Sequence, residues 1–178
     1  MNKKYIAVPS AGIEAIPMLS ASADFGAEFS ECRKYRYALW RIWDRTKPLA
    51  MFIGLNPSTA NETESDPTIK SVGRISKHNG FGGFYMMNCF AFVSTNPGDL
   101  ELESNNDVND FWLNKIAAEC KTIVFAWGNF DVVKKTGRYW EIKQMFGDEA
   151  MVLSQNKNGS PKHPLYCKSE TKFIKWND

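Results

Sequence analysis

The sequence predicts an α/β fold, a three-layer α/β/α sandwich around a short, mostly parallel central sheet. From Pro48 onward, short apolar segments alternate with longer segments in which apolar residues recur at helical spacing. Glycine or asparagine ends several of the apolar segments, as is typical where a buried strand gives way to a loop. Strands that alternate with helices favour a parallel sheet, because each crossover helix covers one of its faces.

The alternation defines the expected elements. Four buried strands are predicted, at residues 49–54, 83–92, 122–128 and 150–155. Three helices are predicted between them, at residues 66–80, 106–120 and 134–146. In the first helix, Asp66 is suited to cap the N-terminus and Pro67 to fill the first helical position, while Gly80 is suited to end it.

The segment before Pro48 is less regular. Residues 1–30, rich in alanine, serine and glycine, are expected to form an N-terminal arm that packs on the core, and residues 31–178 a single α/β domain. Tyr35–Trp43 mixes aromatic and basic residues with partial period-two alternation, which predicts a strand with one wetter face. The solvated face of an edge strand explains its arginines more simply than phosphate contacts do.

Composition argues against several classes of protein. A chain of 178 residues that is 43% hydrophobic builds one sizeable core. Its formal net charge of +2 neither demands nucleic acid as a partner nor excludes a local basic groove. Because four cysteines form no CxxC pair and there are only two histidines, no metal, cofactor or disulfide framework is expected. With no secretory signal pattern and no apolar segment of spanning length, we expect a soluble cytoplasmic protein that does not bind membranes.

Polar residues follow the predicted strands at the points where they end. Ligands of parallel α/β sheets bind outside the carboxyl ends of the strands. Asn56 follows the first strand, Asn88 ends the second, and His163 lies in the loop after the fourth. A proline follows both Asn56 and His163, which restricts their backbones and helps to aim their side chains. We therefore expect these three side chains to converge on one site.

The chemistry of these side chains suits a nucleobase. An asparagine amide carries a donor and an acceptor, as the amide-like edge of a base does. A histidine can donate to an oxygen that gains negative charge as a base departs, while an aromatic ring such as Phe84 stacks on the base. Asn56 can orient a water, and Asp66 is close enough in sequence to act as a general base. The simpler interpretations stay open, with Asn56 a turn residue and Asp66 only a helix cap.

A set of ordered motifs between Cys32 and Tyr166 resembles a known family. It is similar to the uncharacterised bacterial and phage family catalogued as domain of unknown function 1643. The motifs that carry this resemblance are CRKYRYALWRIW, FIGLNPSTAN, DPTI, GFGGFYMMNCFAF, NPGDL, IVFAWGN and GSPKHPLY.

A more remote resemblance is to the uracil-DNA glycosylase superfamily, whose fold is a three-layer sandwich around a short parallel sheet. Gly54–Pro57 resembles its first motif, and His163-Pro164 the start of its second. The resemblance implies that Asn56 positions the attacking water, His163 stabilises the departing base and Asn88 reads the base. Leu165-Tyr166 stands where those enzymes have a serine-containing loop. The substrate therefore stays open between single-stranded DNA, a modified base and a free nucleotide.

Together these observations predict a uracil-DNA glycosylase-like protein that recognises a nucleobase and hydrolyses an N-glycosidic bond in DNA or a nucleotide. The alternative is a non-catalytic module that binds a nucleotide or modified base on the same fold. The expected catalytic residues are Asn56, His163 and Asp66. The expected binding residues are Gly54, Leu55, Pro57, Ser58, Phe84, Asn88, Gly128 and Asn129. The sequence leaves the identity of the base and the oligomeric state open.

Overall fold

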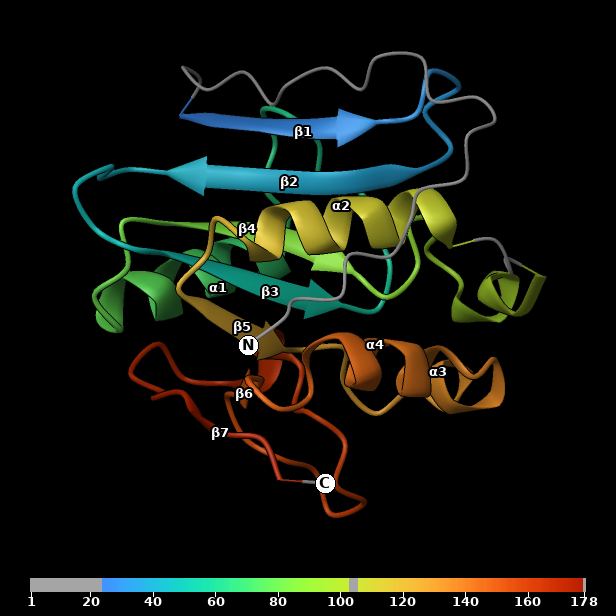
Figure 1. Ribbon diagram of the computed structural model, residues 1–178. Helices are drawn as coiled ribbons and strands as arrows, with labels where there is room; N and C mark the ends of the chain where they lie inside the picture. Colours follow the sequence, from blue (N-terminus) through green and yellow to red (C-terminus); the bar gives the residue numbers. More distant parts are fainter. Residues whose placement is uncertain (1–23, 103–105, 178) are drawn as a thin grey trace.

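A seven-stranded mixed sheet forms the centre of the computed structural model, which describes residues 24–102 and 106–177 (Figure 1). The strand order is β1-β2-β4-β3-β5-β6-β7. The four strands from β4 to β6 run parallel to one another. They are β4 (Gly83–Asn88), β3 (Leu49–Gly54), β5 (Thr122–Phe125) and β6 (Met151–Val152).

Antiparallel strands flank this parallel group on both sides. β2 (Arg36–Ile42) lies antiparallel to β4, and β1 (Phe25–Phe29) lies antiparallel to β2. On the other side, β7 (Ile174–Lys175) lies antiparallel to β6. The expectation of a short, mostly parallel sheet is therefore corrected to a seven-stranded mixed sheet, parallel only in its centre. Apolar runs identify strands, but the direction in which neighbouring strands pair depends on the tertiary fold.

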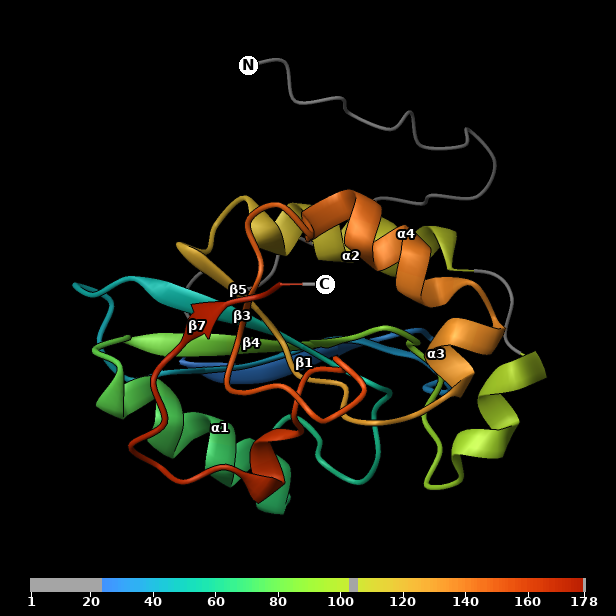
Figure 2. The same ribbon diagram turned by 90° about the horizontal axis from the view of Figure 1, so that it is seen from below.

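Helices cover both faces of the sheet (Figure 2). α1 (Pro67–His78) covers one face, where Ile69, Val72 and Ile75 pack on residues such as Phe52 and Phe84. The other face carries α2 (Asp107–Ala117), α3 (Val132–Lys135) and α4 (Arg138–Phe146). We call these the α1 face and the α2 face. Two short 3₁₀ helices, η1 (Pro97–Leu102) and η2 (Pro164–Tyr166), complete the described elements.

The start of α1 follows the sequence prediction. Asp66 Oδ1 accepts a hydrogen bond from the Ile69 N–H at 2.8 Å, and Pro67 occupies the first turn, where its missing N–H costs no hydrogen bond. Gly80 adopts a φ of 81°, a conformation that favours glycine, two residues after the helix ends. The predicted cap and stop of this helix are confirmed.

The predicted helix over residues 134–146 is instead divided into α3 and α4. Gly137 lies between them with a φ of 79°, which interrupts the helical hydrogen bonding. α4 then starts at Arg138, whose buried Nε donates to the Cys89 carbonyl at 2.7 Å. The same guanidinium pairs with Asp110 and Glu141, so it joins α4 to α2 and to the end of β4.

β2 is an internal strand and not the edge strand that its sequence suggested. Residues 25–29, which fall in the expected N-terminal arm, form β1 and pair with β2 along its length. Residues 1–23 of that arm lie outside the described residues. Arg36 is only 2% exposed and Arg41 is half-buried. Both side chains bind backbone carbonyls, so β2 has no wet face at these positions.

The arginines of β2 anchor the loop of residues 55–66, which joins β3 to α1. Arg36 Nη1 donates to the Ala60 carbonyl at 2.6 Å. Arg41 Nη2 donates to the carbonyls of Asn61 and Glu64. Because β4 lies between β3 and β2, the loop passes across the end of β4 to reach these partners. Among the described helices, none is both long and apolar enough to cross a membrane.

Candidate functional site

The parallel strands end together at one end of the sheet, which we call the carboxyl end. In Figure 1, the arrows of β3 and β4 point toward it. Gly54 and Asn88, the last residues of these strands, are paired in register. The loops that carry Asn56, Gly128 and His163 follow β3, β5 and β6 at the same end. The predicted residues therefore come from the end of the sheet where ligands of such folds bind.

Asn88 is a buried amide with an unpaired donor. It is 1% exposed, and its Nδ2 has no hydrogen-bond partner among the described residues. Strand alternation places its side chain on the α1 face, together with Phe84 and Met86. A Cβ atom at Gly54 would lie 2.9 Å from Asn88 Oδ1 and 2.5 Å from Met86 Cε. Glycine at position 54 therefore makes the space that the amide occupies.

Asn56 is held by the segment that follows β4. Its Nδ2 donates to the carbonyls of Ser94 at 2.7 Å and Pro57 at 3.0 Å, with a longer contact of 3.4 Å to Phe92. Because carbonyl oxygens surround the amide nitrogen, the orientation of the amide is determined and Oδ1 points the other way. No described residue donates a hydrogen bond to this Oδ1. The side chain thus fixes a loop and presents an acceptor.

His163 lies immediately before η2 and is held in one tautomer. Its Nδ1 accepts the Leu165 N–H at 3.3 Å, so the neutral ring carries its proton on Nε2. Burial lowers the pKa of His163, and the negative charge of Asp66 partly opposes that shift. Gly128 packs against His163, since a Cβ at position 128 would be 3.2 Å from His163 Cβ. The result is a neutral imidazole that can donate from Nε2.

Asp66 connects several of the predicted residues. While Oδ1 caps α1, Oδ2 accepts a hydrogen bond from the Ser58 hydroxyl at 3.2 Å. The negative charge of Asp66 opposes the burial that lowers the pKa of His163 and of Arg36. Asp66 therefore lies within electrostatic reach of both side chains. Asp66, Ser58 and His163 are therefore brought together on the α1 face. The cap is established, while a role as general base stays a prediction.

Arg36 belongs to this cluster and was not predicted as a site residue. Its Nε has no partner among the described residues, although the group is buried. Burial lowers the pKa of Arg36 to about 10, against the opposing effect of Asp66, so the side chain remains cationic at neutral pH. The sequence signal for Arg36 as a site residue was its position among apolar and aromatic residues. That position was interpreted instead as part of a solvent-exposed strand face. Arg36 Nε and Asn88 Nδ2 are therefore both buried donors on the α1 face without a partner among the described residues.

A comparison with protein-family models supports the family resemblance. The model described as "Protein of unknown function (DUF1643)" matches residues 36–165, which is most of the chain. The chain belongs to this family. The DUF1643 match begins with β2 and ends within η2, so it includes Arg36, Asn88 and His163. No curated protein and no solved structure matches the chain.

Within the DUF1643 region, not every predicted residue reaches the site. Phe84 lies at the other end of β4 from Asn88 and is 1% exposed in the core, where it packs edge-on against Phe52. The structure therefore places its ring away from the carboxyl end, in the core of the α1 face. Leu55 is buried in the core of the α2 face. Asn129 is exposed, and its Oδ1 accepts a hydrogen bond from Asn158, which links the loops after β5 and β6.

Two hollows stand out on the described surface, and neither is lined by Asn56, Asn88 or His163. One lies beside α4 and β7, with Trp140 and Trp176 in its wall, and has a volume of about 670 Å³. The other has a volume of about 220 Å³ and lies at the carboxyl end on the α2 face. Within the described part of the chain, no hydrogen bond joins Asn56 to His163. The candidate site is therefore defined by the polar groups described above and not by either of these two hollows.

Proposed function

We propose that the carboxyl end of the sheet binds a nucleobase-containing ligand on the α1 face and hydrolyses its N-glycosidic bond. The observation that carries this proposal is the amide of Asn88, which is buried beside Gly54 with its Nδ2 unpaired. A buried donor without a partner destabilises the protein by about 1–3 kcal/mol. A ligand whose carbonyl accepts this hydrogen bond therefore binds more tightly. The adjacent Oδ1 lets the same amide accept from a ring N–H.

His163 supports hydrolysis as the reaction. When the bond between the sugar C1′ and the base nitrogen breaks, its electron pair stays on the base, and negative charge develops on a base oxygen. The Nε2–H of a neutral His163 can donate a hydrogen bond to that oxygen. The nearby charge of Asp66 favours a positive imidazole only weakly, because burial dominates.

Asn56 supports the placement of the attacking water. Its Oδ1 is free to accept a water O–H, while the Ser94 and Pro57 carbonyls fix the other half of the amide. The water oxygen forms the new bond to C1′, and the proton that it loses balances the charge on the departing base. Asp66 is the predicted acceptor for that proton, since each of its oxygens keeps a lone pair beyond its present hydrogen bond.

A non-catalytic base-binding module is the second candidate. It is favoured by the hydrogen bonds of Asn56, which are sufficient by themselves to explain an asparagine at this position. In that case Asn88 reads a base and His163 only rigidifies the loop before η2.

The two candidates differ in their products. We would incubate the protein with single- and double-stranded oligonucleotides carrying uracil, mismatched bases or modified pyrimidines, and with the matching nucleotides. Alkaline cleavage then reports abasic sites, and chromatography reports free base. Hydrolysis that Asn56→Ala reduces in turnover far more than in affinity supports the enzyme, because a water-orienting group acts in the transition state.

The controls separate binding from chemistry. Asn114→Ala removes an exposed amide on α2, on the other face of the sheet, and should change neither property. Retained binding that depends on Asn88, without any released base, favours the module. An absence of both binding and hydrolysis across the panel contradicts the proposal.

A further inference from the structure

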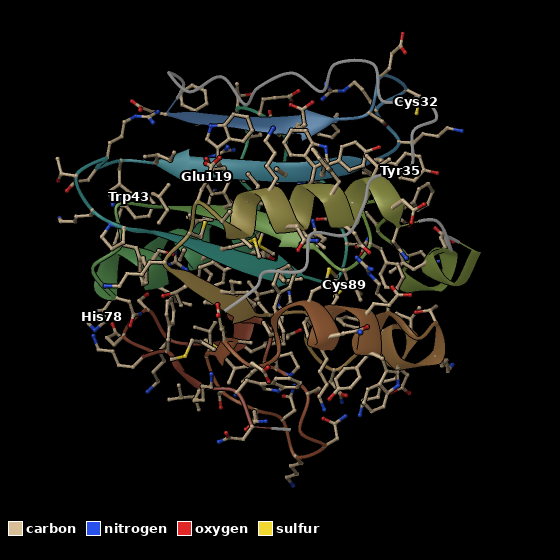
Figure 3. The ribbon with its side chains drawn as sticks, in the orientation of Figure 1. Cys32, Tyr35, Trp43, His78, Cys89 and Glu119 are labelled. Carbon is tan, nitrogen blue, oxygen red and sulfur yellow. The ribbon has the colours of Figure 1, made fainter. Side chains whose placement is uncertain are left out.

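The smaller hollow lies on the α2 face, where β4 ends and α2 begins. Figure 3 shows Tyr35 and Cys89 at this end of the sheet. The volume of the hollow is about 220 Å³. We call it the aromatic hollow, because four rings and the first turn of α2 form most of its wall. These residues are Tyr35, Tyr37, Phe90, Phe92, Val108 and Asn109.

Asn109 brings an unpaired acceptor to this wall. It is 2% exposed, and its Nδ2 donates to the carbonyls of Asn88 at 3.0 Å and Cys89 at 3.1 Å. These two carbonyls determine the orientation of the amide, so the remaining atom is Oδ1. That Oδ1 is buried and has no hydrogen-bond partner among the described residues. A ligand N–H is the group that would satisfy it.

The walls of the aromatic hollow select the shape and charge of its occupant. Tyr35 and Phe92 form a tilted ring pair with centroids 5.8 Å apart, and Tyr37 is backed by a stacked Trp112 at 6.4 Å. Such ring faces bind flat π systems. None of the described residues that line the hollow is charged, so a neutral ring fits it better than a phosphate. Its volume lies below the roughly 300 Å³ at which drug-sized pockets begin, which leaves space for one ring system.

We infer that the aromatic hollow binds one neutral, planar heteroaromatic ring of the nucleobase type, which donates an N–H to Asn109 Oδ1. The sugar and phosphate of a nucleotide stay outside, beside the half-exposed Val108 at the mouth. This site is separate from the proposed reaction, because the side chain of Asn88 lies on the other face of the sheet. The two sites are linked through main-chain carbonyls, since that of Asn88 accepts from Asn109 and that of Phe92 lies 3.4 Å from Asn56 Nδ2.

The test is a titration of ¹⁵N-labelled protein, followed by two-dimensional NMR. The probes are 9-methyladenine, 1-methylcytosine and 1-methyluracil, each paired with an analogue in which every remaining N–H is methylated. We expect at least one N–H probe to shift the side-chain amide of Asn109 and the backbone amides of Phe90 and Phe92. Its methylated analogue should bind about tenfold more weakly, because the loss of a hydrogen bond to a buried acceptor is comparable to the 1.4 kcal/mol of a tenfold change.

Two variants of Val108 provide the matched control. Val108 is 46% exposed, so substitution there leaves the core intact. Val108→Trp should fill the mouth and abolish the shifts, whereas Val108→Ala should preserve them. Gly54→Ala, whose added Cβ meets Met86 Cε and Asn88 Oδ1 on the α1 face, should also preserve them.

The outcomes decide the inference. Equal affinity for a probe and its methylated analogue, unchanged binding by Val108→Trp, or no shift at Asn109 with any probe would overturn it. Nucleoside monophosphates and short single-stranded oligonucleotides then identify the source of the ring. Tighter binding of the oligonucleotide assigns the ring to a nucleic acid strand, and equal binding assigns it to a free nucleotide.

Discussion

Replacement of Asn56 by aspartate or alanine separates its structural contribution from its proposed chemistry. The amide nitrogen of Asn56 faces the carbonyls of Ser94 and Pro57 at 2.7 and 3.0 Å. Alanine removes both hydrogen bonds. Aspartate keeps the shape of the side chain but places a carboxylate oxygen where the donor was, directly against two acceptors. We therefore expect Asn56→Asp to be the less stable variant at neutral pH, although it is the closer match in shape.

The magnitudes follow from the two short hydrogen bonds. At about 1 kcal/mol for each bond, Asn56→Ala should lower the free energy of unfolding by about 2 kcal/mol. For a domain of this size, that loss corresponds to a fall in Tm of about 4–8 °C. Asn56→Asp should lose about 1–3 kcal/mol more, because a partly buried charge faces two acceptors.

Thermal and urea unfolding at pH 7 and at pH 4.5 provide the assay. The carbonyls raise the pKa of the new carboxyl in the folded state, so its penalty is present at neutral pH and shrinks as falling pH protonates it. A protonated carboxyl can again donate to Ser94. If Asn56→Asp matched the wild type at pH 7, or if its deficit did not shrink at low pH, the assigned orientation of the amide would be wrong.

Three further predictions follow from the described contacts. Gly54→Ala should weaken ligand binding at the carboxyl end by about tenfold or more with little loss of Tm, because its Cβ displaces the Asn88 amide. Calorimetry measures the affinity, and thermal unfolding measures Tm. Burial lowers the pKa of His163, so its contribution to stability is present above the unfolded pKa of about 6.5 and is lost as pH falls below that value. His163→Gln should flatten this part of a stability–pH profile from urea unfolding, and an unchanged profile would contradict the assignment. Arg138→Met should lower the free energy of unfolding, measured with urea, by about 2 kcal/mol. This is less than the roughly 3–5 kcal/mol for breaking a fully buried ion pair, because the carboxylates of Asp110 and Glu141 are partly solvated.

The elements that the sequence predicted well are those whose signals are local. LAMFIG is a continuous apolar run that ends at Gly54, and it forms β3 with the expected bounds. The dipeptide Asp66-Pro67 marks the start of α1 because capping depends on adjacent residues. These signals require no knowledge of the rest of the fold.

The missed elements depend on distant partners. FGAEF forms β1 only because β2 offers hydrogen bonds along its length, and its own alternation is weak, with most of its side chains partly exposed. β7 has two residues, too few for any periodicity. The division of α3 from α4 had a local signal in Gly137, but an isolated glycine inside a helical pattern is often tolerated.

The candidate site shows the same division. The rule that ligands bind at the carboxyl ends of parallel strands directed attention to one end of the sheet, and the structure places Asn88 and His163 there. Arg36 was missed, because its burial depends on the Ala60 carbonyl and on Asp66, which lie 24 or more residues later in the sequence. The unpaired Oδ1 of Asn109 was missed as well, because its helical position gives no sign that the amide nitrogen binds strand carbonyls.

The attachment of the 55–66 loop to β2 has a kinetic consequence. The loop crosses the end of β4 and is fastened by Arg36 and Arg41, while Arg33 forms an exposed ion pair with Glu62. In the proposed function, a ligand would reach the buried Asn88 amide only after this segment has moved, and association that requires such a rearrangement is slower than simple collision. Replacing Arg41 with methionine should therefore speed capture and release together in a stopped-flow measurement, while equilibrium affinity changes little.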